Sequence, residues 1–264
     1  LGNDFVIIDN RQKITNLTKE QIIKICNRNF LGCDQLILIE KDKSADAFLK
    51  FYNSDGGESG ACGNGTRCVA DLISKERNNK SIVLKTISGN LKSEILGNNI
   101  VTTEIGKAKT EWNEIPLSEK LNTKNLNIKI SDKDNKEHSG GTAVNVGNPH
   151  IIFFVNKIDN FDIKKIGPNI ENHKIFPERC NVTIAQVVDE NLIKVKVWER
   201  GAGLTKACGT AACATAFAGK LNNLTNNKTD IEFEDGKLTI SIDEKNSIHM
   251  KGPVSDIKEI EIKL

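Results

Sequence analysis

The chain has 264 residues, 38% hydrophobic and 27% charged, a composition typical of a globular protein with one large domain or two modest ones. Its 37 basic and 35 acidic side chains leave a net charge of +2, which argues against the strongly cationic surface of a nucleic-acid-binding protein. The longest apolar run, residues 151–155, is far shorter than the roughly 20 residues that span a bilayer, so we expect no membrane partner.

Strand-like and helix-like segments alternate along the chain. β-Branched and aromatic residues in partial alternation predict strands at 48–53 and 192–199. A glycine-bearing loop follows each strand, and a stretch rich in Ala, Leu and basic residues then predicts a helix, at 63–76 and at 209–221. Three strand-like runs follow each helix: 82–87, 91–96 and 100–105 in the first half, and 230–234, 238–243 and 247–251 in the second.

The two halves resemble each other. Residues 61–70 (ACGNGTRCVA) and 207–216 (ACGTAACATA) share Ala, Cys, Gly and a closing Ala at an offset of 146, and glycines elsewhere recur within one residue of this offset. We infer a duplication. Two helices are too few to cover both faces of a parallel sheet, so we expect a mostly antiparallel or mixed sheet curled around one helix in each half.

The duplication also sets the domain boundaries. We expect an N-terminal domain at 1–106 and a C-terminal domain at 107–252, with a linker inside the polar, Asn- and Lys-rich stretch 107–137. A last strand-like run, 257–264, lies beyond the repeat, so a C-terminal strand at 253–264 is expected to return to the first domain. The start at Leu1 rather than Met suggests missing residues at the front.

Two glycine-rich segments do not complete a nucleotide-binding motif. Residues 60–67 have the glycine spacing of a P-loop, but Thr66 and Arg67 stand where that motif needs Lys and then Ser or Thr. After the glycines at 201 and 203, the third glycine of a dinucleotide-binding fingerprint would fall on Lys206. Both nucleotide readings are therefore disfavoured.

The seven cysteines do not indicate zinc or disulfides. Cys62 and Cys68 are separated by five residues and Cys208 and Cys213 by four, both along predicted helices rather than on the turn of a structural zinc site. The N-terminus shows no signal-peptide pattern, so we expect thiols in a reducing cytoplasm.

Cys62 and Cys208 are the pair that the duplication singles out. Each begins a predicted helix, where unpaired N–H groups and the helix dipole favour an anion and can lower a thiol pKa. The glycine after each thiol would let a carboxylate approach the helix start. Two opposed thiols can remove a proton from one face of a carbon and deliver one to the other face without another cofactor. The remaining cysteines are expected to be small buried hydrophobic residues: Cys26, Cys33, Cys68, Cys180 and Cys213.

Five segments, in order along nearly the whole chain, resemble a known family. They are 1–5 (LGNDF), 53–56 (NSDG), 61–68 (ACGNGTRC), 147–150 (GNPH) and 198–210 (WERGAGLTKACGT). On these segments the chain resembles diaminopimelate epimerase. The resemblance implies an α/β (α+β) fold of two pseudo-symmetric domains, each a barrel-like sheet around a central helix. It also implies a homodimer and a pyridoxal-independent isomerase that interconverts LL- and meso-diaminopimelate in lysine and peptidoglycan biosynthesis.

The resemblance further implies roles for individual residues. Cys62 and Cys208 would be the acid/base thiols, and His150 and Glu199 would tune their pKa values. The helix-start donors to the substrate carboxylate would be Gly63, Asn64, Gly209 and Thr210, and the other substrate-binding positions would be Asn3, Gln35, Asn53, Asn148, Asn181, Glu199 and Arg200. Three positions depart from the family pattern: Leu204 replaces the usual Glu, Cys180 a common Thr, and Ala211 a common Gly.

Other functions remain open. A cofactor-independent racemase of proline, hydroxyproline or another amino acid would use the same two thiols, although Arg200 and the asparagines favour a substrate with a second amino-acid end. A non-catalytic amino-acid-binding member of the fold would be expected to lose one thiol, and this chain has both. Nucleic-acid binding is disfavoured because one Tyr and two Trp offer little stacking surface.

Overall fold

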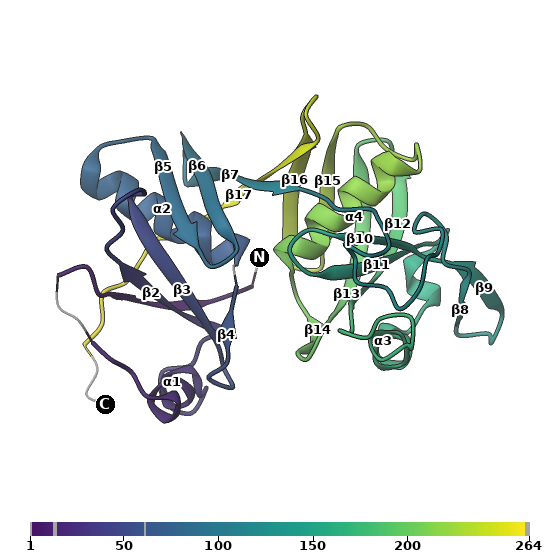
Figure 1. Cartoon of the computed structure of the whole chain (residues 1–264), viewed down its shortest axis with the longest axis horizontal. Helices are drawn as coiled ribbons and strands as arrows, with labels where there is room; N and C mark the ends of the chain where they lie inside the picture. The colour runs from purple at the N-terminus through teal and green to yellow at the C-terminus, as the bar shows by residue number, and fades with distance from the viewer. Residues whose placement is uncertain (1, 13–14, 61, 262–264) are drawn as a thin grey trace. The chain divides into compact units, whose positions relative to one another are not determined.

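The structure is a computed structural model that describes residues 2–12, 15–60 and 62–261. The chain divides into two compact units. The Cys62 unit comprises Asn3–Glu104 and the C-terminal segment from Lys251, and the Cys208 unit comprises Ile105–Met250 with Gly2. Strands β7 (Ile100–Lys107) and β17 (Ser247–Pro253) each carry the chain from one unit to the other (Figure 1).

The Cys62 unit is a mixed sheet with two helices. Its strand order is β1-β2-β3-β5-β6-β7, with the short β4 paired to β3. The pairs β1/β2 and β3/β5 are parallel, whereas β2/β3, β5/β6 and β6/β7 are antiparallel. The elements are β1 Phe5–Asp9, α1 Lys19–Cys26, β2 Gln35–Glu40, β3 Ala47–Asn53, β4 Glu58–Ser59, α2 Gly63–Arg77, β5 Ser81–Thr86 and β6 Gly89–Gly97.

The Cys208 unit repeats this topology. Its strands run β10-β11-β12-β13-β15-β16-β17 with β14 on β13, and the parallel pairs β11/β12 and β13/β15 occupy the places of β1/β2 and β3/β5. The elements are β8 Ile128–Ser131, β9 Glu137–Gly140, β10 Thr142–Asn145, β11 Pro149–Phe154, the 3-10 turn Ile158–Asn160, α3 Ile163–Glu171, β12 Asn181–Asp189, β13 Leu192–Glu199, β14 Gly203–Thr205, α4 Gly209–Leu221, β15 Lys228–Phe233 and β16 Gly236–Ile242. The expected fold class of two pseudo-symmetric α/β (α+β) domains is confirmed.

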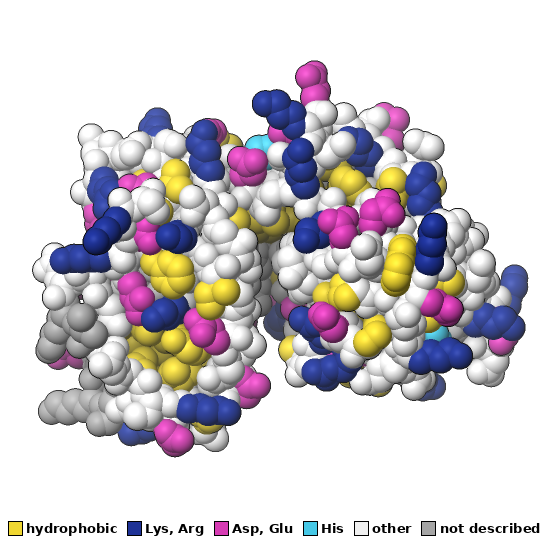
Figure 2. All heavy atoms as spheres, viewed as in Figure 1, with side chains coloured by type: hydrophobic (Ala, Val, Ile, Leu, Met, Phe, Trp, Pro, Cys, Tyr) yellow, Lys and Arg dark blue, Asp and Glu magenta, His cyan; other side chains and the backbone are white. Residues whose placement is uncertain are grey.

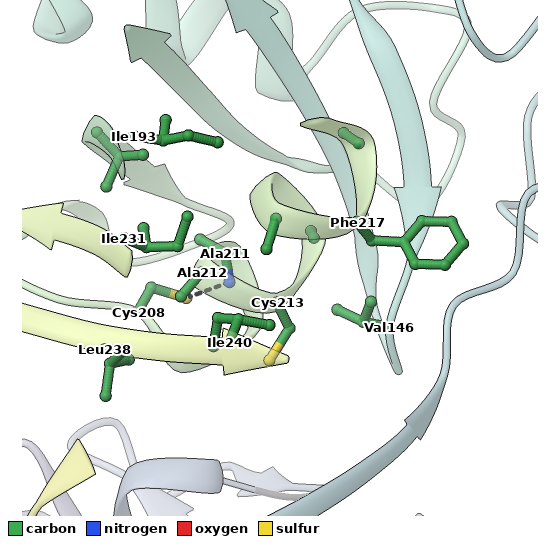
Figure 3. Packing of buried hydrophobic residues seen from close by; sticks show 14 of the residues in the cluster. Val146, Ile193, Cys208, Ala211, Ala212, Cys213, Phe217, Ile231, Leu238 and Ile240 are labelled. Atoms are coloured by element: carbon green, nitrogen blue, oxygen red, sulfur yellow. Dashed lines mark hydrogen bonds between the residues drawn. The ribbon is translucent and has the colours of Figure 1, made fainter. Parts of the chain in front are cut away.

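Each unit folds around the helix that a cysteine begins (Figure 1). In the Cys62 unit, α2 buries Val69, Ala70 and Ile73 against sheet residues such as Phe51. In the Cys208 unit, α4 is buried from residue 211 to residue 219. Figure 3 shows its side chains among those of β13, β15 and β16. Because α4 is apolar on every side, it can be covered on every side without burying a charge.

A second helix in each unit corrects the expectation of one helix per half. Helix α1 connects the parallel strands β1 and β2, and α3 connects β11 and β12. Thr18 and Gln21 form a capping box at α1, a signal that the sequence does contain. Both helices are short and amphipathic, so their apolar residues are too few to stand out as a period. They cover the second face of each sheet through separate clusters.

The stretch 107–137, which was expected to contain a linker, lies within the Cys208 unit. Its scattered apolar residues, Ile115, Leu117, Leu126, Ile128 and Ile130, are all buried in one cluster of the Cys208 unit. The β8–β9 hairpin forms a separate two-stranded sheet there. The stretch is polar in average composition, but its five buried apolar side chains pack it against the core of the Cys208 unit.

The expected strand at 253–264 is wrong over most of its length. Strand β17 ends at Pro253, which has no N–H to extend the ladder. Val254 is buried in the Cys62 unit and donates its N–H to the Asn99 carbonyl oxygen at 2.8 Å, so the chain does return to this unit. Residues 254–261 form no helix or strand, Ile257 and Ile260 are exposed, and 262–264 lie outside the described residues.

Over the described part of the chain, we find no helix with the length and apolar character needed to cross a membrane. Basic and acidic side chains alternate over the visible faces of both units rather than gathering by sign (Figure 2).

We expect Ile73→Ala to lower the free energy of unfolding by about 2–5 kcal/mol, because it leaves a cavity at a residue that is 0% exposed in α2. The matched control is Ile87→Ala, which changes a side chain that is 60% exposed in the same unit and should cost less than about 0.5 kcal/mol. Urea unfolding measures both. Equal midpoints for the two variants would contradict this placement of the core.

Candidate active site

Cys62 is the residue that caps α2. Its Sγ accepts the N–H of Gly65 at 3.4 Å, and its carbonyl oxygen accepts the N–H and the hydroxyl of Thr66, both at 2.8 Å. A Cβ on Gly65 would lie 2.7 Å from Ile37 Cδ1 and 3.1 Å from Phe51 Cε1, so a larger residue there would have to displace buried side chains of the sheet. The thiol is half-buried.

Cys208 caps α4 in the same way. Its Sγ accepts the N–H of Ala211 at 3.4 Å (Figure 3) and lies 3.3 Å from the Thr210 hydroxyl. Both cysteines have extended backbone angles, φ −141° and ψ 108° for Cys62 and φ −135° and ψ 115° for Cys208. Each sulfur therefore takes the place of the side-chain oxygen that usually caps a helix. Cys208 is only 6% exposed.

The surroundings of Cys208 outweigh the effect of the helix start. Burial raises the pKa of this thiol well above its ordinary value, and the Glu199 carboxylate, which hydrogen-bonds the thiol, raises it further. The Thr210 hydroxyl and the Ala211 N–H act in the opposite direction but are weaker. The pKa lowering expected at a helix start is therefore wrong for Cys208, which is a protonated thiol at neutral pH.

Asn181 fixes the turn that follows β13. Its Oδ1 accepts the backbone N–H of Arg200 at 3.0 Å, and its Nδ2 donates to the Pro149 carbonyl oxygen at 3.0 Å. The guanidinium of Arg200 donates to the Glu178 carbonyl oxygen at 2.9 Å. The structure thus brings three of the expected binding positions, Asn181, Glu199 and Arg200, to adjoining strand ends of the Cys208 unit.

His150 is fully buried and contacts another expected binding residue. Its Nε2 lies 2.8 Å from Asn148 Oδ1, which can only accept, so we assign the Nε2–H tautomer. Burial and the nearby positive charge of Arg200 lower the pKa of His150 to about 3, and the ring is neutral at pH 7. The described contact orients the Asn148 amide, and an effect of His150 on either thiol stays a prediction.

The expected binding residues of the Cys62 unit form two groups. In the first, Arg67 Nη2 donates to Asn64 Oδ1 at 2.9 Å, Asn64 Nδ2 donates to Asn3 Oδ1 at 2.7 Å, and Asn3 Nδ2 donates to Asp34 Oδ2 at 3.1 Å. This Arg67–Asp34 chain sets the orientation of both amides. In the second group, Gln35 Nε2 donates to Asn53 Oδ1 at 2.8 Å across the paired ends of β2 and β3.

Three residues that bind or orient the candidate site are not identified by the sequence analysis, two in the Cys62 unit and one in the Cys208 unit. Asp34 and Arg67 close the two ends of the amide chain, and Glu171 accepts from Trp198 and from the Gly201 N–H. An Arg inside an apolar helical stretch is a signal that could have been used for Arg67, which is only 2% exposed. Nothing in the sequence separates Asp34 or Glu171 from the other acidic residues.

Comparison with known proteins places this arrangement in a family. The family model for diaminopimelate epimerase matches residues 1–111 and 142–257. A diaminopimelate epimerase of Pelagibacter ubique (strain HTCC1062) is 69% identical over 264 residues, covering 100% of this chain and 96% of that protein. The chain belongs to the diaminopimelate epimerase family. The resemblance seen in the sequence is thereby confirmed.

More distant proteins support the family by their sequences and the fold by their structures. A diaminopimelate epimerase of Acidiphilium cryptum (strain JF-5) is 39% identical over 262 residues, covering 99% of this chain and 93% of that protein. A crystal structure of a Bacillus anthracis phenazine biosynthesis protein of the PhzF family has a TM-score of 0.67 at 16% identity, covering 100% of this chain and 94% of that chain. At this identity the likeness concerns the fold alone. Residues 112–141 of this chain, which lie between the two matched segments, contain the β8–β9 hairpin.

We expect Glu199→Gln to lower the pKa of Cys208, because it removes the carboxylate charge that disfavours the thiolate. The pH dependence of alkylation, followed by mass spectrometry of the peptide that carries Cys208, measures this. Glu190→Gln, which removes an exposed charge elsewhere in the same unit, is the control. An unchanged midpoint in Glu199→Gln would contradict the assigned contact.

We expect His150 to make the unfolding free energy fall as the pH falls. Its pKa of about 3 in the folded chain is below the ordinary value of about 6.5, so between these pH values only the unfolded chain binds the proton. The loss should be about 2 kcal/mol between pH 7 and pH 5. Urea unfolding of His150→Asn should show a smaller difference between these two pH values than the wild type, and an equal difference would contradict the prediction.

Proposed function

We propose that this chain interconverts LL- and meso-diaminopimelate by two-base proton transfer between Cys62 and Cys208. The observation that carries the proposal is the matched cap: in each unit a cysteine sulfur accepts the N–H of the third helical residue at 3.4 Å. Membership of the diaminopimelate epimerase family supports the substrate. We place the reaction in lysine and peptidoglycan biosynthesis, as the resemblance implies.

In this mechanism one cysteine begins as a thiolate and the other as a thiol. The thiolate removes the α-proton from one face, and the thiol delivers its proton to the opposite face, so the two cysteines exchange protonation states in each turnover. The high pKa of Cys208 suits it to donate the proton in the protonation state described here. Glu199 favours this state because its charge opposes ionisation of the thiol.

The helix starts would hold the charge that develops when the α-proton leaves. The first N–H groups of a helix have no partner within it, and those of Gly63, Asn64, Gly209 and Thr210 occupy these positions. Donors fixed in advance stabilise a developing charge more than mobile water does. We propose that this replaces the electron-withdrawing role of pyridoxal phosphate.

The remaining positions would hold the distal end of the substrate. A guanidinium binds a carboxylate through two hydrogen bonds, which suits Arg200, and the amides of Asn3, Gln35, Asn53, Asn148 and Asn181 are oriented by the contacts described above. Polar groups left without a partner would disfavour an amino acid that lacks the distal group.

We further propose that the two compact units are the two domains, and that the enzyme acts in the cytoplasm as a homodimer. The repeated topology supports the first statement, and the resemblance to the family supports the second. Sedimentation analysis of the purified chain tests the dimer.

The decisive experiment incubates the reduced protein with LL-diaminopimelate in heavy water. We expect meso-diaminopimelate with deuterium at the inverted α-carbon, measured by NMR and chiral chromatography. A folded, reduced protein that yields neither would contradict the proposal. Inversion of proline or hydroxyproline instead would favour the racemase alternative, and binding of diaminopimelate without exchange would favour a non-catalytic binding protein.

Cys62→Ala and Cys208→Ala should each lower the rate of inversion by about 10²–10⁴-fold, because each removes one of the two acid/base groups. Cys68→Ala is the matched control, since this half-buried thiol lies on the helix that Cys62 caps and has no role in the mechanism. Wild-type rates in either of the first two variants would rule out two-base transfer between these thiols.

A further inference from the structure

The carboxylate of Glu171, at the end of α3, joins three parts of the Cys208 unit. Its Oε2 accepts the indole N–H of Trp198 at 2.7 Å, and its Oε1 accepts the backbone N–H of Gly201 at 2.9 Å. Arg179 Nη1 donates to the same Oε1 at 3.2 Å. Glu171 is only 6% exposed, so these bonds replace the water that the carboxylate has lost.

The Trp198 ring also packs closely against helix α3. Gly167 precedes Glu171 by four residues and therefore lies on the same face of the helix. A Cβ on Gly167 would lie 2.3 Å from Trp198 Cγ, so only glycine lets the indole approach the helix this closely. Gly167 admits the ring and Glu171 binds its N–H, which fixes both the depth and the rotation of the indole.

Both anchors flank the residues that the proposed function uses. Trp198 immediately precedes Glu199, and Gly201 immediately follows Arg200. Glu171 thus holds the residue on each side of the Glu199–Arg200 pair.

The third partner of Glu171 supports the Arg200 side chain. Arg179 follows Glu178 in the chain, and the Glu178 carbonyl oxygen accepts from the Arg200 guanidinium. The hydrogen bond from Arg179 to Glu171 therefore restrains the backbone next to Glu178, whose carbonyl oxygen binds the Arg200 guanidinium.

We propose that Glu171 is a positioning residue that holds Glu199 and Arg200 in place for the reaction. The proposal rests on the proposed function, in which Arg200 binds the distal carboxylate and Glu199 acts on Cys208. Glu171 itself contacts neither thiol in the described structure. Its effect passes through Trp198 and Gly201, and a displaced guanidinium weakens substrate binding more than it slows proton transfer.

The test is Glu171→Gln in the full chain. Glutamine has nearly the same shape, but one of its two terminal atoms is an NH2 group that cannot accept from Trp198 or Gly201. We expect KM for diaminopimelate to rise at least tenfold while kcat changes less. We also expect the Trp198 indole and Gly201 amide resonances to move in ¹H–¹⁵N spectra. The control Glu190→Gln removes an exposed charge of the same unit and should leave KM and both resonances unchanged.

A second variant, Trp198→Phe, keeps an aromatic ring but removes the N–H that Glu171 binds. It should raise KM by a smaller factor, and the double variant should raise KM by less than the product of the two single effects, because both changes break the same bond. If Glu171→Gln does not fold, Trp198→Phe alone decides.

A KM within twofold of the wild type, in folded Glu171→Gln or otherwise in Trp198→Phe, would overturn the proposal. Failure of the proposed function has a different result, because the wild type itself would then not invert diaminopimelate. In that case the ¹H–¹⁵N resonances test the positioning role of Glu171. Unchanged Trp198 and Gly201 resonances in Glu171→Gln would overturn this role. If Glu171→Gln does not fold, an unchanged Gly201 resonance in Trp198→Phe would overturn it.

Discussion

The hydrogen bond from a helix N–H to a cysteine sulfur is the contact on which the candidate site depends. It occurs twice, at Cys62 and at Cys208, with nearly the same backbone angles. In both places a strand, a short return strand and the helix follow one another, so the sheet decides where the helix begins. The capping cysteine is then held at the start of the most buried helix of its unit, where its sulfur lies beside the free N–H groups of the first turn.

The two units use this shared geometry differently. Around Cys208, burial and a carboxylate keep the proton on the sulfur, and the neighbouring polar groups are strand-end residues. Around Cys62, the thiol is half-buried, and the start of the helix that it caps places Asn64 and Arg67 in a chain of hydrogen bonds that ends at Asp34. The duplicated fold therefore supplies equivalent positions, while the side chains around them make the two positions chemically different.

The sequence predicts the elements whose ends are marked by a motif or a clear residue pattern, and it misses those that do not stand out by composition. Helix α4 falls on the expected residues 209–221 and β13 on 192–199, because the Cys-Gly pair and the β-branched run mark their ends clearly. Helices α1 and α3 were missed because they are eight and nine residues long. The stretch 107–137 was misjudged because burial depends on where five apolar residues lie and not on their fraction. The strand expected at 257–264 has a suitable pattern, but pairing needs a neighbour that only the folded structure reveals. The same limit applies to the site. Sequence resemblance points to Asn3 and Asn64, whereas the contacts that orient them are known only once β1 and α2 are placed.

Helix α4 combines complete burial with small side chains, since Ala211, Ala212, Ala214, Ala216 and Ala218 are all at most 1% exposed. Alanine loses no side-chain rotamer freedom on folding, so this helix is ordered at a low entropic cost. The same feature leaves no solvent-facing side between residues 211 and 219 on which a longer residue could be accommodated. A longer side chain in place of any of these alanines would have to displace buried neighbours, whereas α2, whose last turn is exposed from Lys75 to Arg77, can change its surface there without disturbing the thiol at its other end.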